Sequence, residues 1–423
     1  MANPLTFYEF FAGAGLARLG LGTDWRCVWA NDIDPRKAEV YTANFGAADL
    51  HIGDVSEIRA ESLPPRADMA WASFPCQDLS LAGWRHGMTA RRSGTFWAFW
   101  RMMRDLYDNA DRPPVIALEN VVGLLYGDSF LGLCESLAAL GLQFGAVVVD
   151  AKRFLPQSRP RVFVIAADSR VDCGRFVEST PSQSDWFTSP VLLAAAQLPE
   201  SIASLWRWWK LPVPQAPVAP LQTMIEDLPE AQWHAREETE RLLGMMSPLN
   251  RAKVEQAASQ PGRTVGLLYR RTRAGGQRAE VRFDGIAGCL RTPQGGSSRQ
   301  TVVVADCGAV RTRLLAPREA ARLMGVPDSY WLPPNYNNSY RAMGDAVAVP
   351  VVQWLSKHLL LPLAEACAAE QCGIRGASIG QSNQASLSRS AAEKLAVTWT
   401  RSHWGKSDDS ETASSYAERL VRE

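Results

Sequence analysis

Short apolar runs alternate with stretches of helical pattern through the first 170 residues, and this alternation constrains the fold more than any other feature. Parallel strands joined by crossover helices produce such a pattern, so we predict a doubly wound, mostly parallel α/β sheet, with a smaller, irregular domain beside it. Sheets of this kind bind ligands beyond the carboxyl ends of their strands. The predicted strands cover residues 5–10, 27–30, 69–73, 115–118, 147–149 and 162–166, and the predicted helices cover 14–21, 35–45 and 317–324.

The charge of the chain is balanced overall but not locally. Its 423 residues are 46% hydrophobic and exceed one ordinary domain of roughly 150 residues. Lysine and arginine number 45 and the acids 44, and this balance excludes a uniformly basic nucleic-acid coat. Residues 263–299, however, hold eight arginines, no lysine and two acids, a local charge of +6. The sequence therefore predicts one basic face within a neutral molecule.

Other signals are weak and favour a cytoplasmic protein. No 18-residue apolar window or leader pattern is found, so we expect no membrane span and no export. The eight cysteines are scattered without a CxxC pair, which is typical of reduced thiols. The five histidines are equally dispersed, so no metal is predicted.

A glycine loop follows the first predicted strand. Gly13 and Gly15 would let the backbone approach a ligand, although a tight turn alone would need the same residues. Arg18 stands where a dinucleotide fingerprint would place a third glycine. Asp32 and Asp54 follow the next strand ends and could bind a ribose and an adenine. This points to an adenosine-containing cofactor, and the choice between NAD and S-adenosylmethionine stays open at this point.

Reactive side chains follow two further predicted strands. Cys76 comes just after the third strand, a position that suits a nucleophile, although a small buried residue is the commoner reading. Glu119 ends the fourth strand, where an acid is a costly choice for packing. Arg159 and Arg161 alternate before the last strand and could grip an anion or a carboxylate.

Eight motifs follow one another over residues 7 to about 355: FAGAG at 11, ND at 31, GDV at 53, FPCQDLS at 74, ENV at 119, PQSRPRVF at 156, RLLAPREAARLMGVPDSY at 313 and GDAVAVP at 344. In this order they resemble the motifs of bacterial DNA (cytosine-5) methyltransferases. The resemblance implies a Rossmann-like class I methyltransferase fold, S-adenosylmethionine as methyl donor, S-adenosylhomocysteine as product and no metal. It also implies that the target cytosine is flipped out of duplex DNA.

The resemblance assigns a role to each residue. Cys76 would add to C6 of cytosine, Glu119 would bind N3, and Arg161 would hold the base carbonyl, with Arg159 supporting the loop. The implied cofactor contacts are Phe11 on adenine, Gly13 and Gly15 at the methionine part, Asp32 at the ribose, Asp54 and Val55 at the adenine, and Pro75, Phe96, Asp345 and Ala346 elsewhere in the pocket. The last motif departs from the family's usual GNSV, because Asp345 and Ala346 replace its asparagine and serine.

The arginine-rich stretch falls where the family keeps its target-recognition domain. By resemblance, Gln277 would fill the space left by the flipped base, and residues 289–292 would lie near the DNA backbone. A solvated loop region is the alternative. The further DNA contacts that we predict are Arg85, in a glycine-hinged loop after Cys76, and Arg278, Arg291 and Arg299.

We predict a catalytic domain of residues 1–170 plus 313–365, a target-recognition domain of 171–312, and a weakly ordered tail of 373–423. The expected function is site-specific cytosine-5 methylation of duplex DNA by a monomeric enzyme. The resemblance implies the modification enzyme of a restriction system with a cognate endonuclease, and a stand-alone or phage-borne enzyme is equally compatible with the chemistry. An RNA (tRNA) cytosine-5 methyltransferase and a catalytically silent DNA-binding relative are the alternatives.

Overall fold

The computed structural model describes residues 3–75, 94–109, 112–181, 186–273, 276–291 and 299–378. The chain divides into two compact units, residues 1–370 and 371–423. The helices and strands below belong to the first unit, apart from the end of the last helix.

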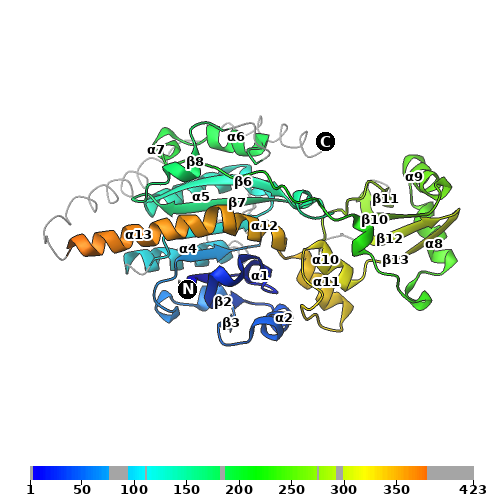
Figure 1. Cartoon of the computed structure of the whole chain (residues 1–423), viewed down its shortest axis with the longest axis horizontal. Helices are drawn as coiled ribbons and strands as arrows, with labels where there is room; N and C mark the ends of the chain where they lie inside the picture. The colour runs from blue at the N-terminus through cyan, green and yellow to red at the C-terminus, as the bar shows by residue number, and fades with distance from the viewer. Residues whose placement is uncertain are drawn as a thin grey trace. The chain divides into compact units, whose positions relative to one another are not determined.

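Seven strands form the larger sheet, in the order β3-β2-β1-β4-β5-β7-β6 (Figure 1). Strands β1 to β5 pair in parallel, and β7 runs antiparallel to both of its neighbours. The predicted α/β class with a mostly parallel sheet is thereby confirmed. The bounds are β1 Leu5–Phe10, β2 Trp25–Asp32, β3 Leu50–Ile52, β4 Met69–Ala72, β5 Val115–Asn120, β6 Leu142–Asp150 and β7 Pro160–Asp168.

Parallel pairing was expected for the strands at residues 147–149 and 162–166, and for these two strands that expectation is wrong. They are parts of β6 and β7, which pair antiparallel from Leu142↔Asp168 to Asp150↔Pro160. Only residues 151–159 connect them, whereas a parallel crossover needs about a dozen residues or more. The short connection therefore makes β7 run back beside β5, which brings its first residues next to the end of β5.

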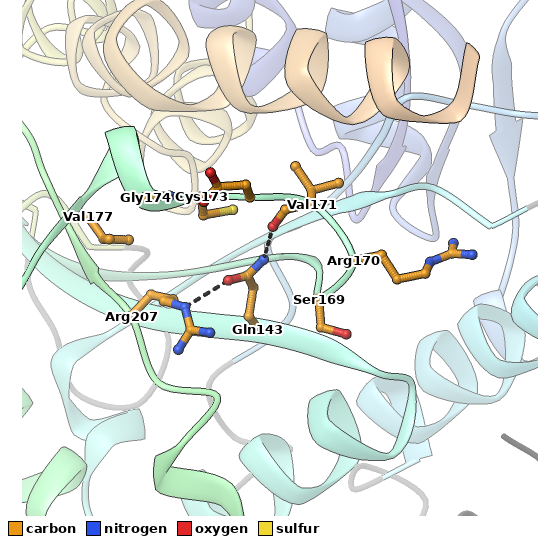
Figure 2. Close-up of a pocket in the computed structure, with 9 residues that line it drawn as sticks. Gln143, Ser169, Arg170, Val171, Cys173, Gly174, Val177 and Arg207 are labelled. Carbon is orange, nitrogen blue, oxygen red and sulfur yellow. Dashed lines mark hydrogen bonds between the residues drawn. The ribbon is translucent and has the colours of Figure 1, made fainter. Parts of the chain in front are cut away.

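Strand β6 is longer than its apolar run because a buried polar side chain within it is fully paired. Gln143 is 2% exposed, and its Nε2 donates to the carbonyl oxygens of Asp168 and Val171. Its Oε1 accepts a hydrogen bond from Arg207 Nε at 2.7 Å (Figure 2). A buried amide with such partners costs little, so the strand continues through it.

Helices from both ends of residues 1–370 pack together beside the larger sheet, because α1 contacts α12. Gly20 in α1 is needed there, because a Cβ on it would lie 2.6 Å from the Cβ of Val352 in α12. The predicted helix at 35–45 is confirmed as α2, with Asp34 as its N-cap and Pro35 at its start. The bounds are α1 Leu16–Leu21, α2 Pro35–Phe45, α4 Gly94–Asp108, α5 Asp128–Ala139, α10 Pro317–Leu323, α11 Tyr336–Gly344, α12 Val349–Leu355 and α13 Leu361–Ser378.

A second, antiparallel sheet has four strands in the order β11-β10-β12-β13 (Figure 1). Helices α8 and α9 cover it and form a small apolar core of their own, which includes Leu242, Val254, Leu268 and Val303. The bounds are α8 Arg236–Gly244, α9 Pro248–Ser259, β10 Arg263–Arg273, β11 Gly276–Arg282, β12 Thr301–Asp306 and β13 Ala309–Leu314.

The segment between the two sheets packs on the larger one. Trp206 contacts Phe144 of β6 edge to face, and Trp209 Nε1 donates to the carbonyl oxygen of Ile165 in β7. This segment contains β8 Val177–Glu178, α6 Ser189–Ala196, α7 Glu200–Ala203 and β9 Trp208–Trp209, and no long helix follows in its described proline-rich part. The predicted domain boundary at residue 171 stays a prediction. Because Leu221 and Ile225 belong to the core of the larger sheet, this packing favours a boundary near residue 226.

Helix α13 continues to Ser378, past Gly373, where the weakly ordered tail was expected to begin. Within the described part of the chain, one helical stretch, Tyr336–Glu370, is long and apolar enough by composition to span a membrane. Its apolar window is 61% buried, and residues 345–348 within it are not helical. These features are those of helices in a protein core.

Candidate active site

The glycine loop after β1 turns sharply and leaves one glycine with an open face. Phe11, Gly13 and Gly15 all have positive φ angles, of 58°, 57° and 77°. A Cβ on Gly15 would lie 2.5 Å from the ring of Phe45, so this glycine is required by packing against α2. A Cβ on Gly13 would meet only the Lys37 side chain, at 3.9 Å. Gly13 is therefore the glycine beside which a ligand has room.

Acidic side chains stand at the neighbouring strand ends, and Asp32 holds the glycine loop. Asp32 Oδ2 accepts from the Gly13 backbone N–H at 2.7 Å, and Oδ1 accepts from that of Asp34 at 2.8 Å. Burial raises the pKa of Asp32, and the positive charge of Lys37 offsets part of that rise. Asp54 is exposed and caps the short turn that begins at the buried Val55. The order of these acids along the sheet edge is the one predicted for an adenosine ligand.

Phe96 lies deeper than its predicted role in the pocket suggests. Its side chain is fully buried, 5.1 Å from the ring of Phe74 and stacked on Trp100. Pro75, by contrast, is exposed. Cys76 and Arg85 lie outside the described residues.

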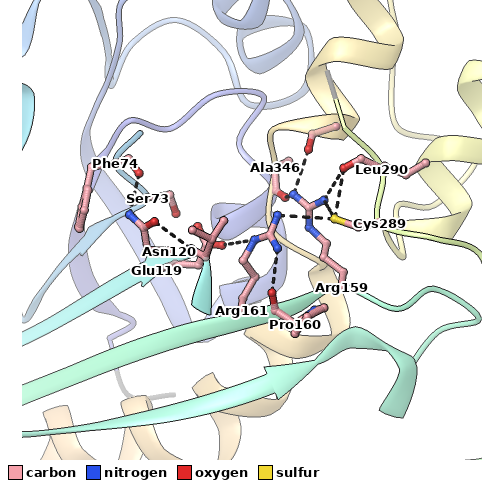
Figure 3. A network of polar contacts seen from close by, with 12 residues as sticks. Ser73, Phe74, Glu119, Asn120, Arg159, Pro160, Arg161, Cys289, Leu290 and Ala346 are labelled. Atoms are coloured by element: carbon pink, nitrogen blue, oxygen red, sulfur yellow. Dashed lines mark hydrogen bonds and ion pairs between the residues drawn. The ribbon is translucent and has the colours of Figure 1, made fainter. Parts of the chain in front are cut away.

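An ion pair joins the ends of β5 and β7. Arg161 Nε lies 3.1 Å from Glu119 Oε1, and Glu119 is only 7% exposed (Figure 3). The next residue, Asn120, donates from Nδ2 to the carbonyl oxygen of Phe74 at 3.1 Å. The segment that leads to Cys76 is therefore tied to the strand that carries Glu119.

Arg159 joins three segments of the chain and is 2% exposed. Its Nη1 donates to the carbonyl oxygen of Leu290, and its Nη2 donates to those of Gly344 and Ala346 (Figure 3). Burial lowers its pKa to about 10. These contacts agree with the predicted support of a loop, and they leave the guanidinium no exposed face toward a substrate.

Cys289 lies beside both arginines, and its expected position near the DNA backbone stays a prediction. Its Sγ is 3.3 Å from Arg159 Nη1 and 3.9 Å from Arg161 Nη2 (Figure 3). Burial alone would raise the pKa of its thiol, but the charges of Arg159 and Arg161 hold it below the ordinary value. A single cysteine in a variable stretch carries no sequence signal for this position.

Lys37 was also missed. Its Nζ lies 2.9 Å from Asp345 Oδ2, so the aspartate that replaces the family's asparagine forms an ion pair with α2. The available signal was a lysine in the first turn of a helix, where the positive end of the helix dipole disfavours a cation.

Four of the five predicted DNA-binding residues are described by the structure, and they lie on or near the smaller sheet. Gln277 and Arg278 are exposed on β11, and Arg278 pairs in register with Arg271 of β10. Arg291 is exposed, while Arg299 lies over the ring of Tyr336 and donates to Asn337 Oδ1. Residues 274–275 and 292–298 of the arginine-rich stretch fall outside the described residues. Within the described ranges, no group of three His, Cys, Asp or Glu side chains could hold a metal ion.

Comparison with known proteins identifies the family of this chain. The family profile described as C-5 cytosine-specific DNA methylase matches residues 5–360. The type II methyltransferase M.HhaI of Haemophilus parahaemolyticus is 27% identical over 361 residues, covering 84% of this chain and 94% of that protein. M.HpaII of Haemophilus parainfluenzae is 27% identical over 385 residues, covering 85% and 90%.

Solved structures show the same fold. The S. pombe Dnmt2 methyltransferase aligns with a TM-score of 0.55 at 17% identity, covering 85% of this chain and 99% of that one. The Entamoeba histolytica methyltransferase EhMeth aligns with a TM-score of 0.57 at 15% identity, covering 86% and 99%. With a family profile over most of its length and this fold, the chain belongs to the C-5 cytosine-specific DNA methylase family.

Proposed function

We propose that this protein transfers a methyl group from S-adenosylmethionine to C5 of a cytosine that is flipped out of a specific duplex DNA sequence. The observation that carries the proposal is the Glu119–Arg161 ion pair, held at the sheet edge beside the segment that leads to Cys76. Cytosine presents an N3 acceptor and a neighbouring carbonyl. An acid and an arginine side by side match that pair of groups.

C5 of an aromatic cytosine is a poor nucleophile toward a methyl donor. The enzyme must therefore supply a nucleophile of its own that activates C5. Addition of the Cys76 thiolate to C6 breaks the aromaticity and makes C5 enamine-like, able to take a methyl group. Glu119 would donate a proton to N3 as the thiolate adds, and Arg161 would hold the base carbonyl. Afterwards a base removes the C5 proton, Cys76 leaves C6 as its thiolate, and N3 returns its proton to Glu119.

S-adenosylmethionine would supply an electrophilic methyl group when bound. The donor set fits its adenosine part, because carboxylates follow β2 and β3 in order and an aromatic side chain, Phe11, is partly exposed beside them. Gly13 has open space on its Cβ side, as close approach of a ligand requires. Asp32 would meet the ribose, and Asp54 with Val55 the adenine.

The smaller sheet would read the DNA. Arg271 and Arg278 face each other across β10 and β11. Glu280 Oε2 lies 3.5 Å from Arg271 Nε, and the Arg278 side chain is exposed. Phosphates or guanine edges are suitable partners for an exposed arginine. The wider setting rests on the type II relatives, and we propose a cytoplasmic modification enzyme that protects the sites of a cognate endonuclease.

An RNA cytosine-5 methyltransferase is the second candidate, and the long arginine-rich region argues against it. One assay separates the two. The protein is incubated with tritiated S-adenosylmethionine and either duplex DNA or tRNA. We expect label in duplex DNA only. Label in tRNA alone would overturn the proposed substrate, and label in neither would favour a silent DNA-binding relative.

A further inference from the structure

The position of Lys37 is unfavourable for a charged side chain. It lies in the first turn of α2, where a cation meets the positive end of the helix dipole. Its side chain is only 20% exposed, so its ammonium has lost part of its hydration. A residue placed against both effects needs compensating anions.

Carboxylates supply that compensation. Asp345 Oδ2 lies 2.9 Å from Lys37 Nζ. Burial would lower the pKa of Lys37, but Asp345 and Asp32 hold it above its ordinary value, so the side chain stays charged. Asp32 is itself bound to the Gly13 N–H, which places this ion pair beside the glycine loop.

The Lys37 stem runs along the open face of Gly13, with its Cδ 3.9 Å from where a Cβ would be. A ligand end that enters beside Gly13 therefore meets an ammonium and a carboxylate next to each other. An α-amino-acid group offers the complementary pair, a carboxylate and an ammonium one carbon apart. An asparagine at 345 would be neutral and could not supply the negative charge of this pair.

We propose that Lys37 and Asp345 form a paired-charge subsite for the amino-acid end of S-adenosylmethionine. Lys37 Nζ binds the ligand carboxylate, and the Asp345 carboxylate binds the ligand ammonium. The inference rests on the proposed function. It adds Lys37 as a cofactor-specificity residue and explains the aspartate in the GDAV motif as half of a pair.

The test measures binding to the full-length chain by calorimetry with three nucleosides. S-adenosylhomocysteine carries the whole amino-acid end, decarboxylated S-adenosylmethionine lacks the carboxylate, and 5′-methylthioadenosine lacks both charges. For Lys37→Met we expect S-adenosylhomocysteine affinity to fall roughly tenfold or more, as for loss of a charged hydrogen bond. Affinity for the two ligands without a carboxylate should stay within about twofold.

Three further variants test Asp345, the charge at position 37 and an unrelated lysine. Asp345→Asn should weaken both ligands that carry the ammonium and spare 5′-methylthioadenosine. Lys37→Arg should retain S-adenosylhomocysteine affinity, and the exposed Lys210→Met is the matched control. Unchanged S-adenosylhomocysteine affinity in Lys37→Met, or an equal loss for all three ligands, would overturn the subsite. If the wild type bound none of the three, the proposed function itself would fail.

Discussion

Single side chains at the sheet edge supply the chemical groups of the candidate active site. Glu119 and Arg161 come from different strands, and each limits the freedom of the other. Such a pair orients an acid toward a bound base without leaving it fully solvated. The neighbouring Arg159 has the opposite character, because its hydrogen bonds go to three carbonyl oxygens of the protein.

Glu119→Gln should therefore slow methyl transfer by roughly 10²–10⁴-fold, the usual contribution of a positioned proton donor. Cofactor affinity should change by less than about twofold, since no described contact joins Glu119 to the glycine loop. Single-turnover methylation and S-adenosylhomocysteine calorimetry measure the two quantities, with the exposed Glu200→Gln as control. An equal loss of binding and turnover would show that Glu119 serves the cofactor pocket.

Glu9 is a buried acid next to the same loop. Its full burial raises its pKa to about 8, from an ordinary value of 4.5, and the backbone N–H and charge of Arg18 offset only part of the rise. The folded state therefore holds the proton more tightly than the unfolded state. Stability from this group is complete below pH 4.5 and is lost as the pH rises to about 8.

Wild-type stability should fall by a few kcal/mol across that window, at no more than about 1.4 kcal/mol per pH unit. Glu9→Gln removes the titration, so its unfolding free energy should be flatter between pH 5 and pH 8. Urea unfolding at several pH values measures this, and Glu57→Gln, an exposed glutamate, should follow the wild type. Parallel pH profiles for Glu9→Gln and wild type would contradict the assignment.

The bounds of some helices and strands could be predicted from local sequence patterns. The direction of a strand and the contacts between residues far apart in the sequence could not. The strand at 5–10 and the helix at 35–45 were predicted with their observed bounds, because apolar period and a Pro-containing cap mark them locally. The direction of β7 depends on the length of one connection. Lys37 and Cys289 acquire partners only in the fold, from Asp345 and from the two arginines.

The junction between β13 and α10 shows how such a pairing stabilises elements. Arg313 and Glu319 are both fully buried and form two hydrogen bonds, of 2.6 and 2.7 Å. Glu319 also accepts from the backbone N–H groups of Glu226 and Ala316. The carboxylate thus joins the start of α10 to the strand before it.

Glu319→Gln should destabilise the fold by about 3–5 kcal/mol, because it leaves a buried arginine without its counter-charge. Glu230→Gln is the matched control, since Glu230 pairs with Arg311 on the same strand but is 85% exposed. Its cost should be about 0–1 kcal/mol. Equal costs for the two variants, in urea unfolding, would contradict the distinction.

The whole molecule has a large core around the seven-stranded sheet and a small separate core under the four-stranded one. The first contains the candidate chemistry, and the second carries exposed arginines. A net charge of +1 over 423 residues conceals this division. Binding to DNA should therefore depend on a local surface rather than on the total charge.

DNA affinity should fall with salt, with a log–log slope of about −0.9 for each phosphate neutralised. Arg278→Gln should make the slope shallower by up to about one such step, if its guanidinium neutralises a phosphate. Fluorescence anisotropy from low to moderate salt gives the slope, and Arg236→Gln, whose arginine already pairs with Glu240 on α8, is the control. A flat salt response would place the DNA surface elsewhere.

The proposed function depends on a covalent bond between Cys76 and C6 of the target cytosine, and trapping with a modified base detects that bond. Duplex DNA with 5-fluorocytosine at the methylated site is incubated with the protein and S-adenosylmethionine, because the fluorine at C5 blocks release. We predict an adduct that survives denaturing electrophoresis and maps by peptide mass to Cys76, present in wild type and Cys307→Ala and absent in Cys76→Ala. An adduct in Cys76→Ala, or one mapped to another residue, would contradict the account.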